Sequence, residues 1–246
     1  MKTLHYGLIV CIFSFLCAII FVFPSKYTIK KNKMITVDKI IFNPFQVNTY
    51  IVYDETKECV IVDAACYDQE EKNALINYIK KHDLKPVALV NTHCHIDHIL
   101  GNSFAAESFN IPLQAHADGQ SFIDNAPQYG MSFGFDIKDP VDIKKTLKEG
   151  DKIEFGSSYL EVIEAPGHAN GSICLLNKEN NILITGDVLF KESIGRTDLP
   201  TGDLDLLLKN IKEKLFTLEE STVVYPGHGP ETSIGHEKVQ NPFILK

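Results

Sequence analysis

The sequence predicts an α/β protein folded as a four-layer αββα sandwich. Three observations lead to this prediction: two halves of the chain each contain several strand-like segments, each half also contains helical patterns, and no low-complexity linker separates them. Two sheets that carry helices bury most apolar surface when they pack face to face with the helices outside. We therefore expect one domain over residues 34–246, preceded by a separate apolar segment over residues 1–33.

The first half alternates strands with helices. Strands are predicted at Ile35–Phe42, Thr49–Tyr53, Glu58–Asp63 and Val87–Asn91, with a hairpin turn at Asp54–Lys57. Asp68 precedes an acidic first turn, which is typical of a helix start, and this helix is expected to run to about Lys81. Its buried face would consist of Leu75, Ile76, Tyr78 and Ile79. A second helix over Ile99–Phe109 and a short strand at Pro112–His116 complete this half.

The second half is again rich in strands. They are predicted at Lys152–Phe155, Tyr159–Glu164, Ser172–Leu176, Ile182–Thr185 and Thr222–Tyr225. Asp203 precedes a helix whose apolar residues follow helical spacing: Leu204, Leu207, Leu208, Ile211 and Leu215. Between the halves, residues 117–142 contain glycines, prolines and four aromatic residues. Two interpretations of this segment stay open: a loop and short helix packed on the sheet, or a lid over a substrate site.

Residues 8–23 form an apolar run that ends at Pro24. As a helix the run would be roughly 24 Å long, which is shorter than a hydrocarbon core of about 30 Å. Two interpretations stay open: a membrane anchor formed by a transmembrane helix, or an N-terminal extension with translation starting at Met34. The domain is expected in the cytoplasm, because four lysines follow the run and only one precedes it.

Composition excludes several function classes. The net charge of −8 argues against a nucleic-acid-binding protein, which would normally carry a basic stripe. Six cysteines lie at scattered positions that suggest no disulfide framework, so a reducing compartment is expected. A small-molecule substrate is therefore the expected partner.

The segment Asn91–His98 concentrates side chains that bind metals. His93, His95, Asp97 and His98 fall within six residues, directly after the apolar run Val87–Val90. Residues i and i+2 of an extended loop point the same way, so His93 and His95 can bind one ion together. Asp97 and His98 follow where the chain turns toward a helix, so they can face a second ion.

Three further candidate ligands stand just past predicted strands. Each follows a glycine: His168 after Gly167, Asp187 after Gly186 and His228 after Gly227. Strand ends are where a layered fold gathers its site. A glycine beside a ligand lets the backbone turn sharply and approach closely. The three segments are therefore expected to meet the Asn91–His98 loop.

These ordered motifs, together with Asp63 at a strand end, resemble the metallo-β-lactamase superfamily over essentially the whole of Ile35–Phe243. The resemblance implies two divalent ions in this fold. One would be bound by His93, His95 and His168, the other by Asp97, His98 and His228, with Asp187 bridging both. Asp187 and Asp97 would be the catalytic residues, and Asp63 would steady the loop without binding a metal. Zinc is the first choice for such ligands, and iron or manganese also suit them.

Within the superfamily, Ser193–Asp198 and Pro230–Phe243 look like the short, glyoxalase II-like thioesterases. This resemblance implies hydrolysis of a small acyl thioester, with hydroxyacyl-glutathione as the leading substrate, by attack of a metal-bridging hydroxide. A thiol leaves readily as thiolate, whereas an amide nitrogen needs an acid, which also favours a thioester. The chain ends at Lys246, before the C-terminal helical domain that contacts glutathione in full-length glyoxalase II, so weak glutathione recognition is expected.

The alternative is a mononuclear iron persulfide dioxygenase of the same superfamily, which shares a segment like Gly195–Asp198 and would need only His93, His95, His168 and Asp187. The context Gly227-His228-Gly229 weighs against it. The remaining histidines, His5, His82, His116 and His236, are expected to lie outside the site, and Cys94 to pack in the core. Arg196 and Asp198 are expected to form an ion pair, with a role in substrate binding as the alternative.

Overall fold

Strand β2 (Val47–Tyr53) is buried along almost its whole length, and alternate residues pack into two different cores. Val47 and Ile51 face a core shared with helices, whereas Tyr50 and Val52 face a core between two sheets. Because side chains alternate across a strand, an apolar run of this kind requires that both faces of the sheet be covered. The structure, a computed structural model, describes residues 34–245 of the chain.

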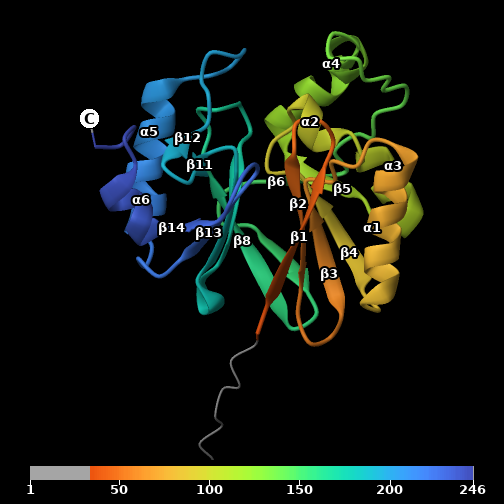
Figure 1. Ribbon diagram of the computed structural model, residues 1–246, viewed down its shortest axis with the longest axis horizontal. Helices are drawn as coiled ribbons and strands as arrows, with labels where there is room; N and C mark the ends of the chain where they lie inside the picture. The colour runs from red at the N-terminus through yellow and green to blue at the C-terminus, as the bar shows by residue number, and fades with distance from the viewer. Residues whose placement is uncertain (1–33, 246) are drawn as a thin grey trace, which may run out of the picture. The chain divides into compact units, whose positions relative to one another are not determined.

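Two six-stranded sheets lie at the centre of the fold (Figure 1). The first has the order β1-β2-β3-β4-β5-β6, with β1 to β3 antiparallel and β3 to β6 parallel. Besides β2 it contains β1 (Thr36–Phe42), β3 (Glu58–Val62), β4 (Lys85–Val90), β5 (Leu113–His116) and β6 (Lys145–Leu147). The second has the order β14-β13-β10-β9-β8-β7. Its strands are β7 (Lys152–Phe155), β8 (Ser158–Glu164), β9 (Ile173–Asn177), β10 (Ile182–Gly186), β13 (Val223–Pro226) and β14 (Thr232–Ser233).

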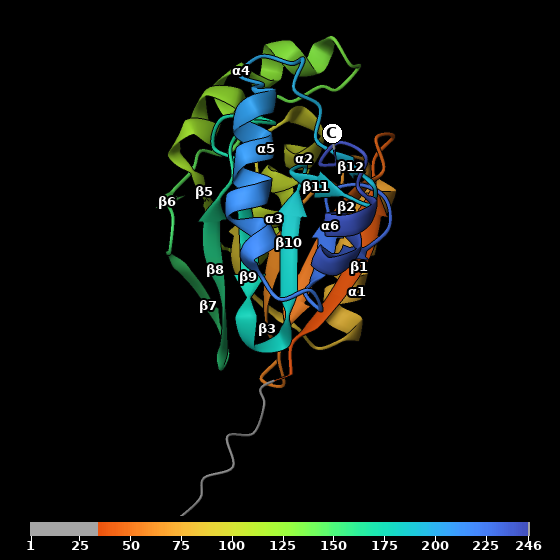
Figure 2. The same cartoon turned by 90° about the vertical axis from the view of Figure 1, so that its left-hand side faces the viewer.

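Helices cover the outer face of each sheet. Helices α1 (Gln69–Lys81) and α3 (Asn102–Phe109) flank the first sheet, and α5 (Leu204–Glu213) and α6 (Ile234–Gln240) flank the second, as Figures 1 and 2 show. The Asp68 and Asp203 side chains accept hydrogen bonds from the first turns of α1 and α5, which satisfies backbone donors that the helix leaves free. The predicted α/β class and four-layer αββα sandwich are therefore confirmed.

The helix predicted over Ile99–Phe109 is confirmed over α3 (Asn102–Phe109), but its start is wrong, because Ile99 ends a separate short helix, α2 (Ile96–Ile99), and the chain breaks at Gly101. The Gly101 amide donates to the Ala64 carbonyl at 2.8 Å. A Cβ atom at Gly101 would come within 2.7 Å of that carbonyl oxygen and 2.6 Å of the Cys66 sulfur. The chain thus turns at the one residue small enough to pack against the loop after β3.

Residues 117–142 contain a helix, α4 (Gln120–Met131). Neither interpretation of this segment gave the bounds of that helix. Its buried face carries Ile123 and Ala126, which pack with Phe135 into the core under the first sheet. Tyr129 and Phe133 stay largely exposed. The inner face of the segment therefore packs as a structural element, and its outer aromatic side chains are free for another role.

The prediction of a transmembrane helix needs correction. Across residues 34–245, no helix is both long enough and apolar enough to cross a bilayer. The apolar run from which the prediction came, residues 8–23, lies outside the residues that the structure describes, as do His5 and the proposed boundary at residue 33.

Asp54 is the first residue of the hairpin turn after β2, and its carboxylate connects the two sheets. It accepts hydrogen bonds from the Thr56 amide at 2.9 Å and from the Ser157 amide at 2.8 Å, and also from the Ser158 hydroxyl at 2.9 Å. Burial alone would raise the pKa of Asp54, but these hydrogen bonds outweigh it and lower the pKa from 3.8 to about 2. The carboxylate form is therefore the one that stabilises the fold.

Replacing Asp54 with asparagine is expected to lower the free energy of unfolding at neutral pH by about 2 kcal/mol, the usual contribution of hydrogen bonds to a charged acceptor. Because the pKa is lower in the folded state, the contribution is complete above about pH 4 and is lost as the pH falls toward 2. Urea denaturation of both proteins across this range checks the prediction, with Asp136→Asn, at an exposed carboxylate, as control. A stability difference that stays constant down to pH 2 would contradict it.

Candidate metal centre

The seven predicted ligands come from five segments that meet at one end of the two sheets. The loop after β4 carries His93 and His95, and the short helix α2 that follows carries Asp97 and His98. The loop between β8 and β9 supplies His168. Asp187 and His228 follow β10 and β13, which are parallel neighbours in the second sheet. Ligands that are far apart in the chain are therefore brought together by strand ends.

Two groups of side chains that share no residue could each hold a metal ion, and a third candidate group, His93, His98 and Asp187, overlaps both. In the first, one ring nitrogen of each of His93, His95 and His168 lies within 4.8 Å of the others. The second consists of Asp97, His98 and His228 and meets the same limit. There the His228 Nε2 atom lies 3.3 Å from the Asp97 carboxylate and 3.3 Å from the His98 Nε2 atom. We call these the histidine group and the aspartate group.

Asp187 lies between the two groups. Its carboxylate oxygens are 3.7 Å from the His168 Nε2 atom, in the histidine group, and 3.5 Å from both His98 and His228 Nε2 atoms, in the aspartate group. The absence of a side chain at Gly227 leaves room for the Asp187 carboxylate, because a Cβ atom at Gly227 would lie 2.2 Å from an Asp187 oxygen. Asp187 is thus the carboxylate that contacts both groups.

The donor atoms fit divalent ions. Among the described residues, the Nε2 atoms of His93 and His168 are buried and have no hydrogen-bond partner. Leaving a buried polar atom unpaired costs about 1–3 kcal/mol, and such atoms are rare in folded proteins. Two imidazole nitrogens left unpaired next to carboxylates match the ligand chemistry of zinc, and also of iron or manganese.

The outer nitrogens of two histidines are held by backbone carbonyl groups. His168 Nδ1 donates to the Arg196 carbonyl at 2.8 Å, and His228 Nδ1 donates to the Phe45 carbonyl at 3.0 Å. A carbonyl oxygen can only accept, so Nδ1 carries the proton and Nε2 keeps the lone pair that a metal requires. Outer hydrogen bonds of this kind also fix the ring orientation.

Asp63 supports one histidine in each group. Its carboxylate accepts from the Thr92 amide and the Thr92 hydroxyl, both at 2.7 Å, and from His98 Nδ1 at 3.1 Å. The Thr92 oxygen also lies 3.2 Å from His93 Nδ1. Asp63 is itself buried and does not belong to either group. These contacts fit the role that the resemblance implied for Asp63, which is to steady the Asn91–His98 loop without binding a metal.

Replacing Asp63 with asparagine is expected to weaken metal binding about 10- to 100-fold, the usual effect of removing an outer partner of a ligand histidine. Asparagine suits the left-handed backbone at this position, where φ is 52°, so the fold should tolerate the change. Competition with a chromophoric chelator gives the affinities, and Asp118→Asn, at an exposed carboxylate, is the control. An affinity equal to that of the control would exclude the role assigned to Asp63.

The electrostatics of the centre differ between neighbouring histidines. Burial, followed by the nearby imidazoles, lowers the pKa of His95 to about 4, so this ring stays neutral at physiological pH. Burial also acts to lower the pKa of His98, but the carboxylates of Asp187, Asp97 and Asp63 outweigh it and raise that pKa well above its usual value. Metal binding at the aspartate group must therefore displace a proton, which makes affinity fall as pH decreases.

The centre opens into a cavity of about 440 Å³, whose lining was not predicted from the sequence. Its aromatic wall contains Phe45, Tyr129 and Phe133, whose rings form a chain with centroid separations of 5.9 and 5.2 Å. Phe190, Leu199 and Arg196 line the other parts. The aromatic content of residues 117–142 was the one signal in the sequence that pointed toward this wall.

The remaining candidates lie outside the two groups. His116 pairs with Glu164 at 3.4 Å, His236 pairs with Glu192 at 3.0 Å, and His82 stacks on Tyr78. Cys94 is buried in the core under the first sheet. Arg196 forms a two-point ion pair with Asp198, with both N–O distances 2.7 Å, and it also lines the cavity.

Comparison with known families and curated proteins gives one consistent match. The model of the metallo-β-lactamase superfamily matches residues 42–228. The probable metallo-hydrolase YqgX of Bacillus subtilis is 37% identical over 202 residues, which cover 82% of this chain and 93% of the relative. The hydroxyacylglutathione hydrolase GloC of Haemophilus influenzae is 31% identical over 210 residues, which cover 85% of this chain and 97% of the relative.

Solved structures show the same similarity. The B3 metallo-β-lactamase BLEG-1 aligns with a TM-score of 0.77 and 34% identity, covering 86% of this chain and 100% of its own. TTHA1623 in a di-iron-bound form aligns with a TM-score of 0.75 and 31% identity, covering 84% of this chain and 100% of its own. ETHE1 from Myxococcus xanthus aligns with a TM-score of 0.71 and 26% identity, covering 86% of this chain and 85% of its own.

Proposed function

The chain belongs to the metallo-β-lactamase superfamily, and on that premise we propose that it is a binuclear metal-dependent hydrolase of small acyl thioesters, with hydroxyacyl-glutathione as the leading substrate. The observation that carries this proposal is the position of Asp187, within 3.7 Å of histidines from both groups. One carboxylate between two groups of ligands is the arrangement that a pair of ions requires. The similarity to GloC supports the choice of substrate.

The proposed ligands are His93, His95 and His168 for one ion, and Asp97, His98 and His228 for the other, with Asp187 shared. Zinc is the proposed metal, and iron or manganese are alternatives that suit the same ligands. The di-iron-bound form of TTHA1623 supports iron as an alternative. When bound, two such ions lower the pKa of water toward about 7 and polarise a carbonyl oxygen.

The protein's own groups orient the reactants in this proposal. Asp187 and Asp97 are ionised, because the neighbouring histidines lower the pKa of each carboxyl even though burial opposes it. Their oxygens can accept a hydrogen bond from the attacking water and hold it against the acyl carbon. The aromatic wall keeps bulk water away from the other side of the substrate. A leaving thiol with a pKa of about 8.5 departs as thiolate, so no further acid is needed.

The test is release of thiol from lactoylglutathione and a panel of other thioesters by the metal-loaded protein. Hydrolysis with kcat/KM above about 10⁴ M⁻¹s⁻¹ for at least one thioester is expected, because that value marks the lower end for typical enzymes. A β-lactam is included, since BLEG-1 is a B3 metallo-β-lactamase. Cleavage of the β-lactam without any thioester would replace the proposed substrate class.

A mononuclear persulfide dioxygenase is the second candidate, because the histidine group and Asp187 alone could hold one iron. The aspartate group weighs against it, since His98 and His228 Nε2 atoms lie 3.3 Å apart and both face Asp187. An oxygen electrode with glutathione persulfide separates the two. Oxygen uptake without thioester cleavage would replace the hydrolase by the dioxygenase.

Residues 34–246 are proposed as the hydrolase domain, located in the cytoplasm. The four cysteines of the described residues, Cys59, Cys66, Cys94 and Cys174, are free and buried, which suits a reducing compartment. A chain shortened to begin at Met34 is expected to keep its melting temperature and its kcat/KM within about twofold, since all seven proposed ligands and both sheets lie after that residue. Loss of solubility or of activity in the shortened chain would contradict this boundary.

A further inference from the structure

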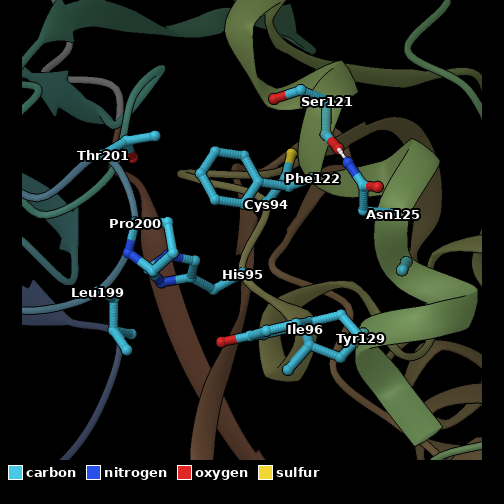
Figure 3. Close-up of a pocket in the computed structure, with 11 residues that line it drawn as sticks. Cys94, His95, Ile96, Ser121, Phe122, Asn125, Tyr129, Leu199, Pro200 and Thr201 are labelled. Carbon is cyan, nitrogen blue, oxygen red and sulfur yellow. Dashed lines mark hydrogen bonds between the residues drawn. The ribbon is translucent and has the colours of Figure 1, made fainter. Parts of the chain in front are cut away.

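A second cavity, which we call the side chamber, lies next to the proposed metal centre. It has a volume of about 260 Å³ and lies between helix α4 and the segment 199–201. Figure 3 shows Asn125 and Tyr129 of α4 on one side and Leu199, Pro200 and Thr201 on the other. No residue of the metal motif other than His95 and its neighbours Cys94 and Ile96 takes part in its lining.

The side chamber adjoins the cavity that contains the proposed ligands. His95, Ile96, Tyr129 and Leu199 line both. The Phe122 ring, inside the side chamber, packs edge-on against the His95 ring with a centroid distance of 5.3 Å. A substrate whose reacting carbon lies at the metal centre can therefore extend one of its two substituents directly into the side chamber.

The lining of the side chamber is uncharged. None of its eleven lining residues is an aspartate, glutamate, lysine or arginine. Three of its polar side chains already form hydrogen bonds: the Asn125 amide donates to the Ser121 carbonyl at 2.7 Å, the Ser121 hydroxyl donates to the Asp118 carbonyl at 3.1 Å, and the Thr201 hydroxyl accepts from the Asn170 amide at 3.0 Å. A charged substituent would therefore be desolvated there without a partner, which is costly.

Charged side chains line the main cavity and a neighbouring depression instead. Arg196 lines the main cavity, and a further depression beside His228 is lined by Lys191 and Glu192. A thioester has two substituents on its reacting group, the acyl chain and the thiol carrier, and a carrier such as glutathione bears charges. The distribution of charge around the centre thus separates the two ends of the substrate.

We infer that the side chamber binds the acyl group of the substrate, and that it favours an apolar acyl group of about the size of a phenylacetyl group over one of two or three carbons. This inference rests on the proposed function and adds the acyl specificity to it. An apolar protein cavity of roughly 150 Å³ is enough to hold benzene, so a chamber of about 260 Å³ has room for an aryl or medium alkyl chain. A lactoyl group would leave most of it unfilled.

The first test compares kcat/KM for the glutathione thioesters of acetate, lactate and phenylacetate. The phenylacetyl ester is expected to be at least about tenfold better, since a filled apolar pocket discriminates by factors of that order. Asn125→Phe should fill the chamber and remove this preference. Asn125→Ala, which loses the same amide without filling the chamber, should keep the preference. Ser121→Leu is a second filling variant if Asn125→Phe does not fold.

The second test does not depend on turnover. Calorimetry of the zinc-loaded protein with the product carboxylates should give a Kd for phenylacetate at least about tenfold lower than that for acetate, and Asn125→Phe should abolish the difference. This result without any thioester cleavage would overturn the proposed function and leave the chamber assignment standing. Equal Kd values, or a preference that survives Asn125→Phe, would overturn the inference even if thioesters are cleaved.

Discussion

Replacing Asp187 with alanine is expected to lower kcat/KM for thioester hydrolysis by roughly 10³-fold or more, the effect of removing one preorganised electrostatic group at a reacting centre. The reason is its position. Its carboxylate is the one that contacts His168 in the histidine group as well as His98 and His228 in the aspartate group. Its loss removes the proposed shared ligand, which is also the proposed hydrogen-bond acceptor for the attacking water.

Initial rates of thiol release, measured together with metal content per chain, check this prediction. Asp198→Ala is the matched control, because the Asp198 carboxylate is exposed, pairs with Arg196 and belongs to neither ligand group. Asp187→Asn keeps the volume of the side chain and removes only its charge, so it should be almost as inactive. More than a tenth of the wild-type rate in Asp187→Ala with full metal content would exclude Asp187 from the chemistry.

Metal removal is expected to have the largest effect on stability. Ions that bind only the folded chain stabilise it by about 4 kcal/mol when the free ion is at about 1,000 times its Kd. For a domain of this size that corresponds to a melting temperature roughly 10 °C lower after chelation. Unpaired buried nitrogens on His93 and His168 are the structural reason, since chelation leaves them without partners. Zinc added back should restore both the melting temperature and the activity.

The number of metal ions bound per chain tests the binuclear assignment directly. Wild-type protein should bind two ions per chain, and His228→Ala should bind one, because His228 belongs to the aspartate group alone. His95→Ala is the matched variant for the histidine group, because His95 belongs to that group alone. His236→Ala, at a histidine paired with Glu192 away from the centre, should bind two. Saturation of the wild type at one ion would reject the binuclear assignment.

The proposed function and the proposed acyl specificity can be rejected independently of each other. Substrate turnover depends on the two ligand groups, whereas the preference for an apolar acyl group depends on α4 and the segment 199–201. Asn125 is not a proposed ligand and makes its hydrogen bond within α4, so its variants change the side chamber without altering the metal centre. An enzyme that cleaves only small thioesters would thus keep its proposed function and lose the proposed specificity.

The sequence by itself predicted the layers of the fold and the seven residues that meet at its centre. Both predictions depend on local patterns. Strands buried on two faces, such as β2, appear as continuous apolar runs, and a helix such as α5 begins at a capping aspartate and repeats its apolar residues at helical spacing. The spacing of His93, His95, Asp97 and His98 brings four candidate ligands together within six residues, which also needs no information from distant residues.

Only the tertiary structure decided the features that depend on contacts between distant segments. The break at Gly101 exists because the loop after β3 occupies the space that a longer helix would need. Strands β6, β11 (Leu189–Phe190), β12 (Ser193–Ile194) and β14 are too short to show a period. Helix α6 depends on the buried Glu237 carboxylate, which accepts hydrogen bonds from the Thr232 hydroxyl and the Glu192 amide. The side chamber is formed between α4 and residues 199–201, segments that meet only in the folded chain. Side-chain periodicity is a local property, whereas shape and burial arise where separate segments pack together.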